Sequence, residues 1–221
     1  MRALGAERRE AASGETRSAL VLLHGYGANG LDLIGLAEPL GGHLPDTLFV
    51  APDAPEACEG APGGLQWFPI PWLDGSSEEA ARAGLARAAD DLDAFLDGLM
   101  VEEDLLPEQV AVLGFSQGAM MALHVLPRRE EPVAAVVAVA GRLLEPELLA
   151  DEARARPPVL LVHGDRDDVV PFAAMGEAAR GLEAAGFREV FAFVQRGTAH
   201  GIAPDGLGVA LAFLRDRLGV A

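Results

Sequence analysis

The sequence predicts an α/β protein built on a mostly parallel central sheet with helices on both faces. Strand-like apolar runs alternate with helical patterns along the 221-residue chain, and this alternation is typical of parallel sheets with crossover helices. Most of the runs are apolar throughout, as expected for strands that are covered on both faces. No internal repeat or Pro/Gly/Ser-rich linker interrupts the pattern. We therefore expect a single domain over residues 18–221, after a polar lead-in over residues 1–17 that is either frayed or an edge strand.

The boundaries of the expected elements follow from the apolar runs and from glycine and proline punctuation. In chain order, the expected strands are Ser18–His24, Thr47–Ala51, Gln109–Leu113, Pro132–Ala140, Pro158–His163 and Glu189–Gln195. The expected helices are Leu31–Leu40, a long helix that starts at Ser76 and includes Leu99, a helix that starts after Gly118, Glu145–Ala155, Phe172–Ala185 and Ala203–Leu218. The long helix has one apolar face at helical spacing, and Ser76 and Glu79 have the spacing of a capping box at its start.

Composition and charge exclude several classes of partner. The net charge is −17 and the chain contains no lysine, so no basic stripe is present to bind the phosphates of a nucleic acid. The single cysteine, Cys58, rules out an internal disulfide. No apolar run reaches the ~20 residues of a membrane-spanning helix, and the N-terminal MRALGAERRE lacks the apolar core of an export signal. These features predict a cytoplasmic protein without a transmembrane segment.

The segment Gln109–Met121 contains the pattern G-x-S-x-G at Gly114–Gly118, the motif of a nucleophile elbow. In an elbow a strand turns sharply into a helix, and only glycine leaves enough room two residues before and two residues after the serine. The hydroxyl of Ser116 would then lie at the amino end of a helix, where free N–H groups and the helix dipole favour developing negative charge. The alternative is a glycine-rich turn with an ordinary capping serine.

An elbow serine needs a histidine base, and in sheets of this kind the acid and then the base follow the serine in the sequence. His200 lies in a short loop after the last expected strand and is the favoured base. We expect His124, on the elbow's own helix, to pack, and His163, at a strand end, to be structural. His24 precedes Ser116 and is expected to brace a glycine-rich loop. A surface-loop histidine is the alternative for His200.

The acid that orients the base is expected in the acidic turn that follows a buried strand. Spacing alone does not choose between Asp165, Asp167 and Asp168. An oxyanion hole needs two backbone N–H groups. One is expected from Gln117, directly after the serine, and the other from Tyr26 in the glycine-rich loop after the first expected strand. All of these loops follow the carboxyl ends of strands, where parallel sheets bind their ligands.

A long irregular stretch between the second expected strand and the long helix carries large apolar side chains. A loop of this length is usually functional or disordered, and its apolar content argues against disorder. It forms either a wall of the substrate pocket or a core flap that packs against the sheet. The pocket candidates are Trp67, Phe68, Ile70, Trp72 and Leu73.

Five motifs occur in the order and spacing of the phospholipase/carboxylesterase family, which the chain resembles from about Ser18 to its C-terminus. The motifs are Leu23–Gly27, Gln66–Phe68, Gly114–Ala119, His163–Pro171 and Ala199-His200. The family includes bacterial carboxylesterases and acyl-protein thioesterases. The resemblance implies an α/β-hydrolase fold without a large lid domain, and it implies Asp167 as the third member of a triad with Ser116 and His200. It also implies hydrolysis of short- to medium-chain esters, thioesters or lysophospholipids without a cofactor or metal. The Gly/Pro-rich stretch Glu56–Leu65 departs from the family pattern and leaves the acyl pocket undetermined.

The favoured function is a serine carboxylesterase that forms an acyl-enzyme on Ser116 with a small-molecule ester or thioester. An acyltransferase or peptidase on the same scaffold would share this mechanism. A non-catalytic binding protein is the third alternative, although such a protein usually loses the serine, the histidine or a glycine of the hole. A metal hydrolase is disfavoured because no H-E-x-x-H or paired-cysteine spacing occurs. The physiological substrate and the formation of a homodimer stay open.

Overall fold

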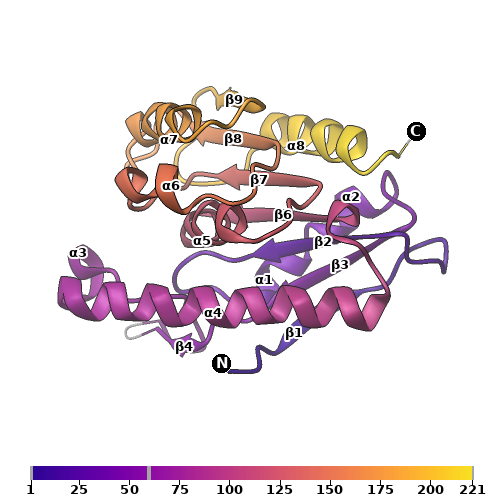
Figure 1. The fold of residues 1–221 in the computed structure, drawn as a ribbon, viewed down its shortest axis with the longest axis horizontal. Helices are drawn as coiled ribbons and strands as arrows, with labels where there is room; N and C mark the ends of the chain where they lie inside the picture. Colours follow the sequence, from indigo (N-terminus) through magenta and orange to yellow (C-terminus); the bar gives the residue numbers. More distant parts are fainter. Residues whose placement is uncertain (1, 59–60, 221) are drawn as a thin grey trace.

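The computed structural model of the chain describes residues 2–58 and 61–220 (Figure 1). In this part of the chain, seven strands form one sheet in the order β1-β3-β2-β6-β7-β8-β9, and all pairs are parallel except β1 with β3. The strands are β1 (Ala6–Arg9), β2 (Ser18–Leu23), β3 (Thr47–Pro52), β6 (Val110–Phe115), β7 (Ala135–Val139), β8 (Val159–Gly164) and β9 (Val190–Gln195). The mostly parallel sheet that the apolar runs predict is confirmed.

Helices cover both faces of the sheet, and a short hairpin lies beyond its edge. The α-helices are α1 (Gly30–Ile34), α2 (Ala37–Gly41), α3 (Pro71–Asp74), α4 (Glu78–Glu103), α5 (Gln117–Val125), α6 (Pro146–Glu152), α7 (Ala173–Ala184) and α8 (Pro204–Arg217). The 3₁₀ turns are η1 (Pro107–Gln109) and η2 (Leu126–Arg128), and the hairpin consists of β4 (Glu56–Ala57) and β5 (Leu65–Gln66). In the described residues, no helix is long and apolar enough to cross a bilayer.

Alternate residues of each central strand face different helical layers, as the pleat of a strand requires. In β2, Val21 and Leu23 pack into a core with α4, α5, α6 and α7. Leu20 and Leu22 pack into a second core with α1, α2 and α8. Both faces of the parallel strands are therefore covered, which explains why their sequences are apolar throughout rather than alternating.

Three local features differ from the expected boundaries. The expected helix 31–40 is two short helices, because Pro39 has no N–H to donate to the carbonyl of Gly35 and a continuous helix would need that bond. The N-cap of α4 is Ser77 rather than Ser76, and the Ser77 hydroxyl accepts the N–H of Ala80 at 3.1 Å. Residues 6–9 form an antiparallel edge strand, one of the two alternatives for the N-terminal segment.

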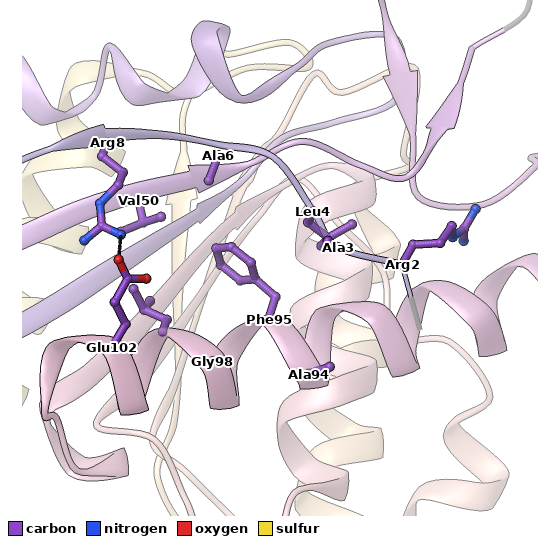
Figure 2. Close-up of a pocket in the computed structure, with 11 residues that line it drawn as sticks. Arg2, Ala3, Leu4, Ala6, Arg8, Val50, Ala94, Phe95, Gly98 and Glu102 are labelled. Carbon is purple, nitrogen blue, oxygen red and sulfur yellow. Dashed lines mark hydrogen bonds and ion pairs between the residues drawn. The ribbon is translucent and has the colours of Figure 1, made fainter.

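A cavity of about 460 Å³ lies between this N-terminal segment and α4 (Figure 2). Its apolar lining includes Leu4, Val50 and Phe95. At one end, the Arg8 guanidinium donates to Glu102 at 3.1 Å. The cavity lies at the β1 edge of the sheet, away from the carboxyl ends of the central strands.

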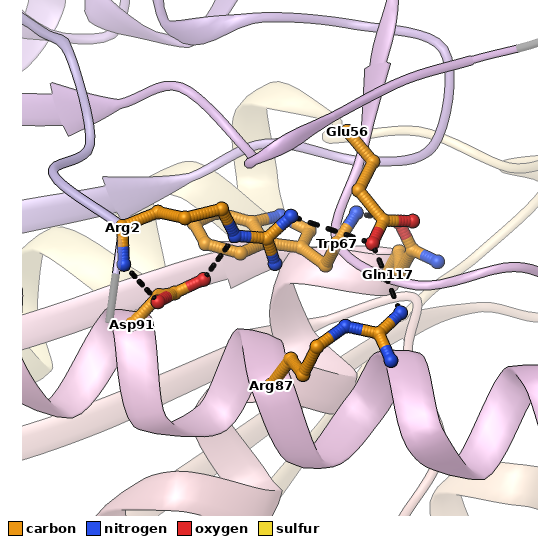
Figure 3. Close-up of polar contacts among 6 residues, drawn as sticks. All are labelled: Arg2, Glu56, Trp67, Arg87, Asp91 and Gln117. Atoms are coloured by element: carbon orange, nitrogen blue, oxygen red, sulfur yellow. Dashed lines mark hydrogen bonds and ion pairs between the residues drawn. The ribbon is translucent and has the colours of Figure 1, made fainter.

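Buried charge ties the first residues of the chain to α4 (Figure 3). The backbone N–H and the Nε of Arg2 donate to the two carboxylate oxygens of Asp91 at 2.5 and 2.7 Å. Burial raises the pKa of the Asp91 carboxyl, but the hydrogen bonds and the charge of Arg2 outweigh it, and the pKa lies below its ordinary value. Glu56 of the hairpin completes the network by pairing with Arg87 of α4 at 3.3 Å.

Candidate active site

The turn between β6 and α5 has the geometry of a nucleophile elbow. Ser116 has φ 53° and ψ −115°, a conformation that is strained for a residue with a side chain. A Cβ at Gly114 would lie 2.3 Å from the carbonyl oxygen of Gly118, and a Cβ at Gly118 would lie 2.0 Å from the carbonyl oxygen of Leu23. Only glycine therefore fits at either position, which is the steric requirement that the sequence motif predicts.

Three side chains from three different loops meet at this elbow. The Nε2 of His200 lies 2.9 Å from the Ser116 hydroxyl, and its Nδ1 lies 2.8 Å from Oδ2 of Asp167. Ser116 and Asp167 are buried, while the imidazole between them is 18% exposed. His200 thus bridges the serine and the carboxylate in the geometry of a Ser-His-Asp triad.

Asp167 is held as a carboxylate by three hydrogen-bond donors. Its Oδ1 accepts the backbone N–H groups of Val169 and Val170, both at 2.9 Å. Its Oδ2 accepts from His200 and lies 3.2 Å from Nε2 of His163. Burial raises the pKa of the Asp167 carboxyl, but the hydrogen bonds from His200, Val170 and Val169 outweigh it, and the pKa lies below its ordinary value. An ionised Asp167 accepts the Nδ1–H of His200, which leaves the Nε2 lone pair directed at the serine.

The two neighbouring carboxylates occupy different places. Asp168 is exposed on the same turn. Asp165 is also exposed, and its carboxylate accepts the N–H of Gly197 at 2.6 Å. Asp165 therefore links the acidic turn to the loop that carries His200. Of the three candidates, the structure brings Asp167 to the histidine.

His24 and His124 lie outside the triad. His24 donates from Nδ1 to the carbonyl of Gly25 at 2.8 Å, and its Nε2 accepts the N–H of Ala54 at 2.9 Å. Burial lowers the pKa of His24. On α5, His124 is buried, and burial together with the charge of Arg128 lowers its pKa to about 4. The Ser116 hydroxyl is hydrogen-bonded to His200 and to neither of these histidines, and His24 braces the glycine-rich loop as expected.

The two expected oxyanion donors lie on segments that adjoin the elbow. Gln117 is the first residue of α5, so its backbone N–H has no acceptor within the helix. Tyr26 follows Gly25, where a Cβ would lie only 3.2 Å from the Cβ of Ser116. The glycine therefore lets the loop after β2 approach the nucleophile closely.

The side chain of Gln117 has a role that the sequence did not indicate. It is fully buried, and its amide oxygen accepts the N–H of Trp67 at 2.9 Å while its amide nitrogen donates to the carbonyl of Phe68 at 2.7 Å (Figure 3). The same segment reaches the other donor loop, because the N–H of Gly27 donates to the carbonyl of Leu65 at 2.8 Å. Residues 65–68 therefore join the two sides of the expected oxyanion hole.

A second glutamine, whose role the sequence also did not indicate, holds the loop that carries His200. Gln195 ends β9 and is fully buried. It donates to the carbonyl of Gly201 at 3.1 Å and accepts the N–H of Ala203 at 2.7 Å. These bonds join Gln195, before His200, to Gly201 and Ala203, after it, and so close the loop. A glutamine at a strand end is the only sequence signal for this role, and it does not specify the partners.

The expectation that the apolar stretch lines the pocket is wrong for Trp67. This side chain has no exposed surface, and its indole N–H donates to the carbonyl of His24 at 3.0 Å. Phe68 and Ile70 are also buried, in the core beneath α4. The physical reason is that the indole finds both an apolar environment and an acceptor inside the core. In contrast, Trp72 and Leu73 on α3 are 59% and 53% exposed.

None of the expected site residues lines the cavity beside α4, so that cavity is not adjacent to the triad. In the described residues, no group of three or more His, Cys, Asp and Glu side chains is arranged to hold a metal ion. The chemical groups that the site offers are therefore a hydroxyl, an imidazole, a carboxylate and backbone N–H groups. This set is sufficient for acyl transfer through a serine nucleophile.

Comparison with known proteins identifies the family. The family described as phospholipase/carboxylesterase matches residues 6–218. The chain belongs to this family. Its fold is accordingly an α/β-hydrolase fold, with no large lid domain in the residues that the structure describes, and the protein is a hydrolase of the carboxylesterase type. The expectations from the motif resemblance are confirmed on both points.

Individual members of the phospholipase/carboxylesterase family are similar over almost the whole chain. The crystal structure of esterase PE8 is 44% identical, covers 98% of this chain and all of that one, and has a TM-score of 0.92. Acyl-protein thioesterase 1 of Saccharomyces cerevisiae is 29% identical over 91% of this chain and 93% of its own. The crystal structure of Zea mays acyl-protein thioesterase 2 is 26% identical, covers 97% and 99%, and has a TM-score of 0.77.

Proposed function

We propose that the protein is a serine carboxylesterase that hydrolyses short- to medium-chain carboxylic esters and thioesters through an acyl-enzyme on Ser116. The observation that carries this proposal is the bridging position of His200, within 2.9 Å of the serine hydroxyl and 2.8 Å of Asp167. The position supports a proton relay because the base is within hydrogen-bond reach of the nucleophile and is oriented by an ionised acid.

In the proposed reaction, Ser116 Oγ attacks the ester carbonyl while Nε2 of His200 takes the hydroxyl proton. Asp167 stabilises the resulting imidazolium through Nδ1–H. The backbone N–H groups of Tyr26 and Gln117 donate to the oxyanion of the tetrahedral intermediate. The imidazolium then protonates the departing alkoxide or thiolate. A water molecule, deprotonated by His200, hydrolyses the acyl-enzyme by the same steps.

The relatives named acyl-protein thioesterase support thioesters as a substrate class beside oxygen esters. The word phospholipase in the family description supports phospholipid esters as a further class, of which the lysophospholipids implied by the motif resemblance are one kind. A panel of p-nitrophenyl esters, acyl thioesters and lysophospholipids, compared by kcat/KM, ranks these classes. Transfer of the acyl group to added alcohols or amines in the same assay would favour the acyltransferase or peptidase alternative.

The test of the nucleophile is Ser116→Ala with a fluorophosphonate probe. We expect kcat to fall by ~10⁴–10⁶, because the triad acts as a unit, and the probe to label the parent protein at Ser116. Ser13→Ala, which removes an exposed serine from the segment before β2, is the matched control and should keep both activity and labelling. Probe labelling that persists in Ser116→Ala would contradict the assignment.

A further inference from the structure

Arg142 lies at the carboxyl edge of the sheet, beside the nucleophile elbow. The end of β7 runs alongside the elbow, since the N–H of Ser116 donates to the carbonyl of Val139 at 2.8 Å. Two residues further on, Gly141 is so close that a Cβ there would lie 3.1 Å from the carbonyl oxygen of Ser116. Arg142 is the next residue and is exposed. Its backbone is therefore positioned by contacts with the catalytic serine itself.

Trp72 lies beside Arg142 and belongs to a segment that is also held at the elbow. Its helix α3 follows directly after Trp67 and Phe68, whose backbone groups are held by the side chain of Gln117. The Trp72 ring lies under the guanidinium of Arg142, 6.0 Å from centroid to Cζ. Two segments that are each anchored to the elbow thus bring an exposed indole face and an exposed cation together at its rim.

The charge of Arg142 has no carboxylate partner among the residues that the structure describes. In contrast, the charges of Arg2, Arg8 and Arg129 are paired with acidic side chains. A guanidinium that lies over an aromatic ring keeps its N–H edge available, and that edge matches the geometry of carboxylate and phosphate oxygens. Arg142 is thus free to bind an anion.

We propose that Arg142 and Trp72 form a subsite that binds a carboxylate or phosphate group carried by the ester substrate. In this subsite, the guanidinium donates to the anion, and the exposed faces of Trp72 and Leu73 cover the apolar chain that carries it. The net negative charge of the protein repels anionic substrates at long range. The guanidinium of Arg142 offsets this repulsion locally, at the rim of the elbow where the substrate binds. This inference rests on the proposed esterase function and narrows its substrate class to esters with an anionic group.

The test compares each anionic substrate with a neutral counterpart that has the same acyl chain length. For a carboxylate on the acyl side, the pair is p-nitrophenyl hydrogen adipate and p-nitrophenyl hexanoate. For a carboxylate on the leaving group, it is S-butanoyl 3-mercaptopropionate and S-butanoyl 3-mercaptopropionamide. For a phosphate, it is 1-butanoylglycerol 3-phosphate and 1-butanoylglycerol. The measured quantity is the ratio of kcat/KM for the anionic substrate to that for its neutral counterpart.

We expect Arg142→Gln to lower this ratio by about fivefold or more in at least one pair, as the loss of one partly exposed charge-assisted hydrogen bond implies. Arg142→Lys should restore part of the ratio because it keeps the charge. The pair that responds identifies where the substrate carries its anion. High salt should weaken the preference of the parent enzyme, since an exposed ion pair is screened.

Arg188→Gln is the control, because Arg188 is exposed at the amino end of β9, on the opposite edge of the sheet. It changes the net charge equally and should leave the ratio unchanged. Equal losses in Arg188→Gln and Arg142→Gln would assign the effect to the overall field and overturn the subsite. A ratio that Arg142→Gln leaves unchanged in all three pairs would also overturn it, while turnover of the neutral esters would show that the esterase function stands. Failure of that turnover would instead refute the esterase function.

Discussion

Replacement of Gln117 by alanine tests whether residues 65–68 hold the oxyanion hole together. The backbone N–H of Gln117 remains in this variant, so the expected donor is not deleted. The side chain is fully buried, and its loss leaves the N–H of Trp67 and the carbonyl of Phe68 without partners. Each buried unpaired polar group costs about 1–3 kcal/mol. Some water enters the space left by the side chain and partly satisfies these two groups. We therefore expect the free energy of unfolding to fall by about 3 kcal/mol, in the lower half of the combined range for two unpaired groups.

The catalytic effect of Gln117→Ala should be separate from this loss of stability. If the clamp positions an oxyanion donor, kcat should fall by about 10- to 100-fold at temperatures where the protein is still folded, somewhat less than for outright deletion of one donor. Urea unfolding gives the stability and p-nitrophenyl ester hydrolysis gives kcat.

Gln109→Ala is the matched control for Gln117→Ala. Gln109 also bonds to two backbone groups, the N–H of Leu106 and the carbonyl of Arg17, but at exposed positions before the start of β6. The free energy of unfolding of Gln109→Ala should fall by about 1 kcal/mol or less, and its kcat should equal that of the parent protein. Parent-like stability and kcat in Gln117→Ala would refute the reasoning.

Three further predictions concern the triad acid and the tryptophans. Asp167→Asn should lower kcat for ester hydrolysis by ~10⁴, as the corresponding change does in a serine protease. Asp168→Asn should have little effect because its carboxylate is exposed. The opposite result would place the triad acid at Asp168. Because the pKa of Asp167 is lowered in the folded protein, the folded state binds the carboxyl proton less tightly than the unfolded state. The Asp167 carboxylate therefore stabilises the fold at pH values above the ordinary pKa of an aspartate, near 3.9. This stabilisation is lost as the pH falls through the lower folded pKa. The difference in unfolding free energy between the parent and Asp167→Asn should therefore shrink at acid pH, and a difference that grows there would contradict the hydrogen-bond assignment. Trp67→Ala should cost about 3–5 kcal/mol in urea unfolding as a core truncation, while Trp72→Ala should cost less than 1 kcal/mol and change substrate preference instead; a stable Trp67→Ala would show that the core tolerates the loss.

Elements and their order were accessible from the sequence because the determining interactions are local or periodic. A strand buried on both faces is apolar at nearly every position, and β2, β6, β7 and β8 have this pattern, with Ser18 and His163 as polar exceptions at strand ends. The split between α1 and α2 was also accessible in principle, since Pro39 stands in the sequence. The apolar spacing of residues 31–40 by itself predicts one helix, and the missing N–H of Pro39 divides it.

The sequence did not show whether the apolar stretch over residues 67–73 lies in the core or at the substrate pocket. Pattern alone does not distinguish a pocket wall from a core flap, because both require large apolar side chains. Trp67 is in the core because His24 offers an acceptor to its indole and Gln117 offers one to its backbone. Those partners lie 43 and 50 residues away in the sequence, and only the assembled sheet brings them together.

The sequence by itself determined the position of the elbow and the alternation of strands and helices. The motif of the elbow is contained within five residues, and the steric conflict that requires Gly114 lies within the turn, whereas the conflict that requires Gly118 is with the neighbouring strand β2. The tertiary structure decided which carboxylate of the acidic turn faces the histidine, and that Gln117 and Gln195 hold the surrounding loops. The reason is physical. Asp165, Asp167 and Asp168 are chemically identical and nearly adjacent, and only the directions of their side chains, set by the Val169 and Val170 N–H groups and by the approach of the His200 loop, distinguish them.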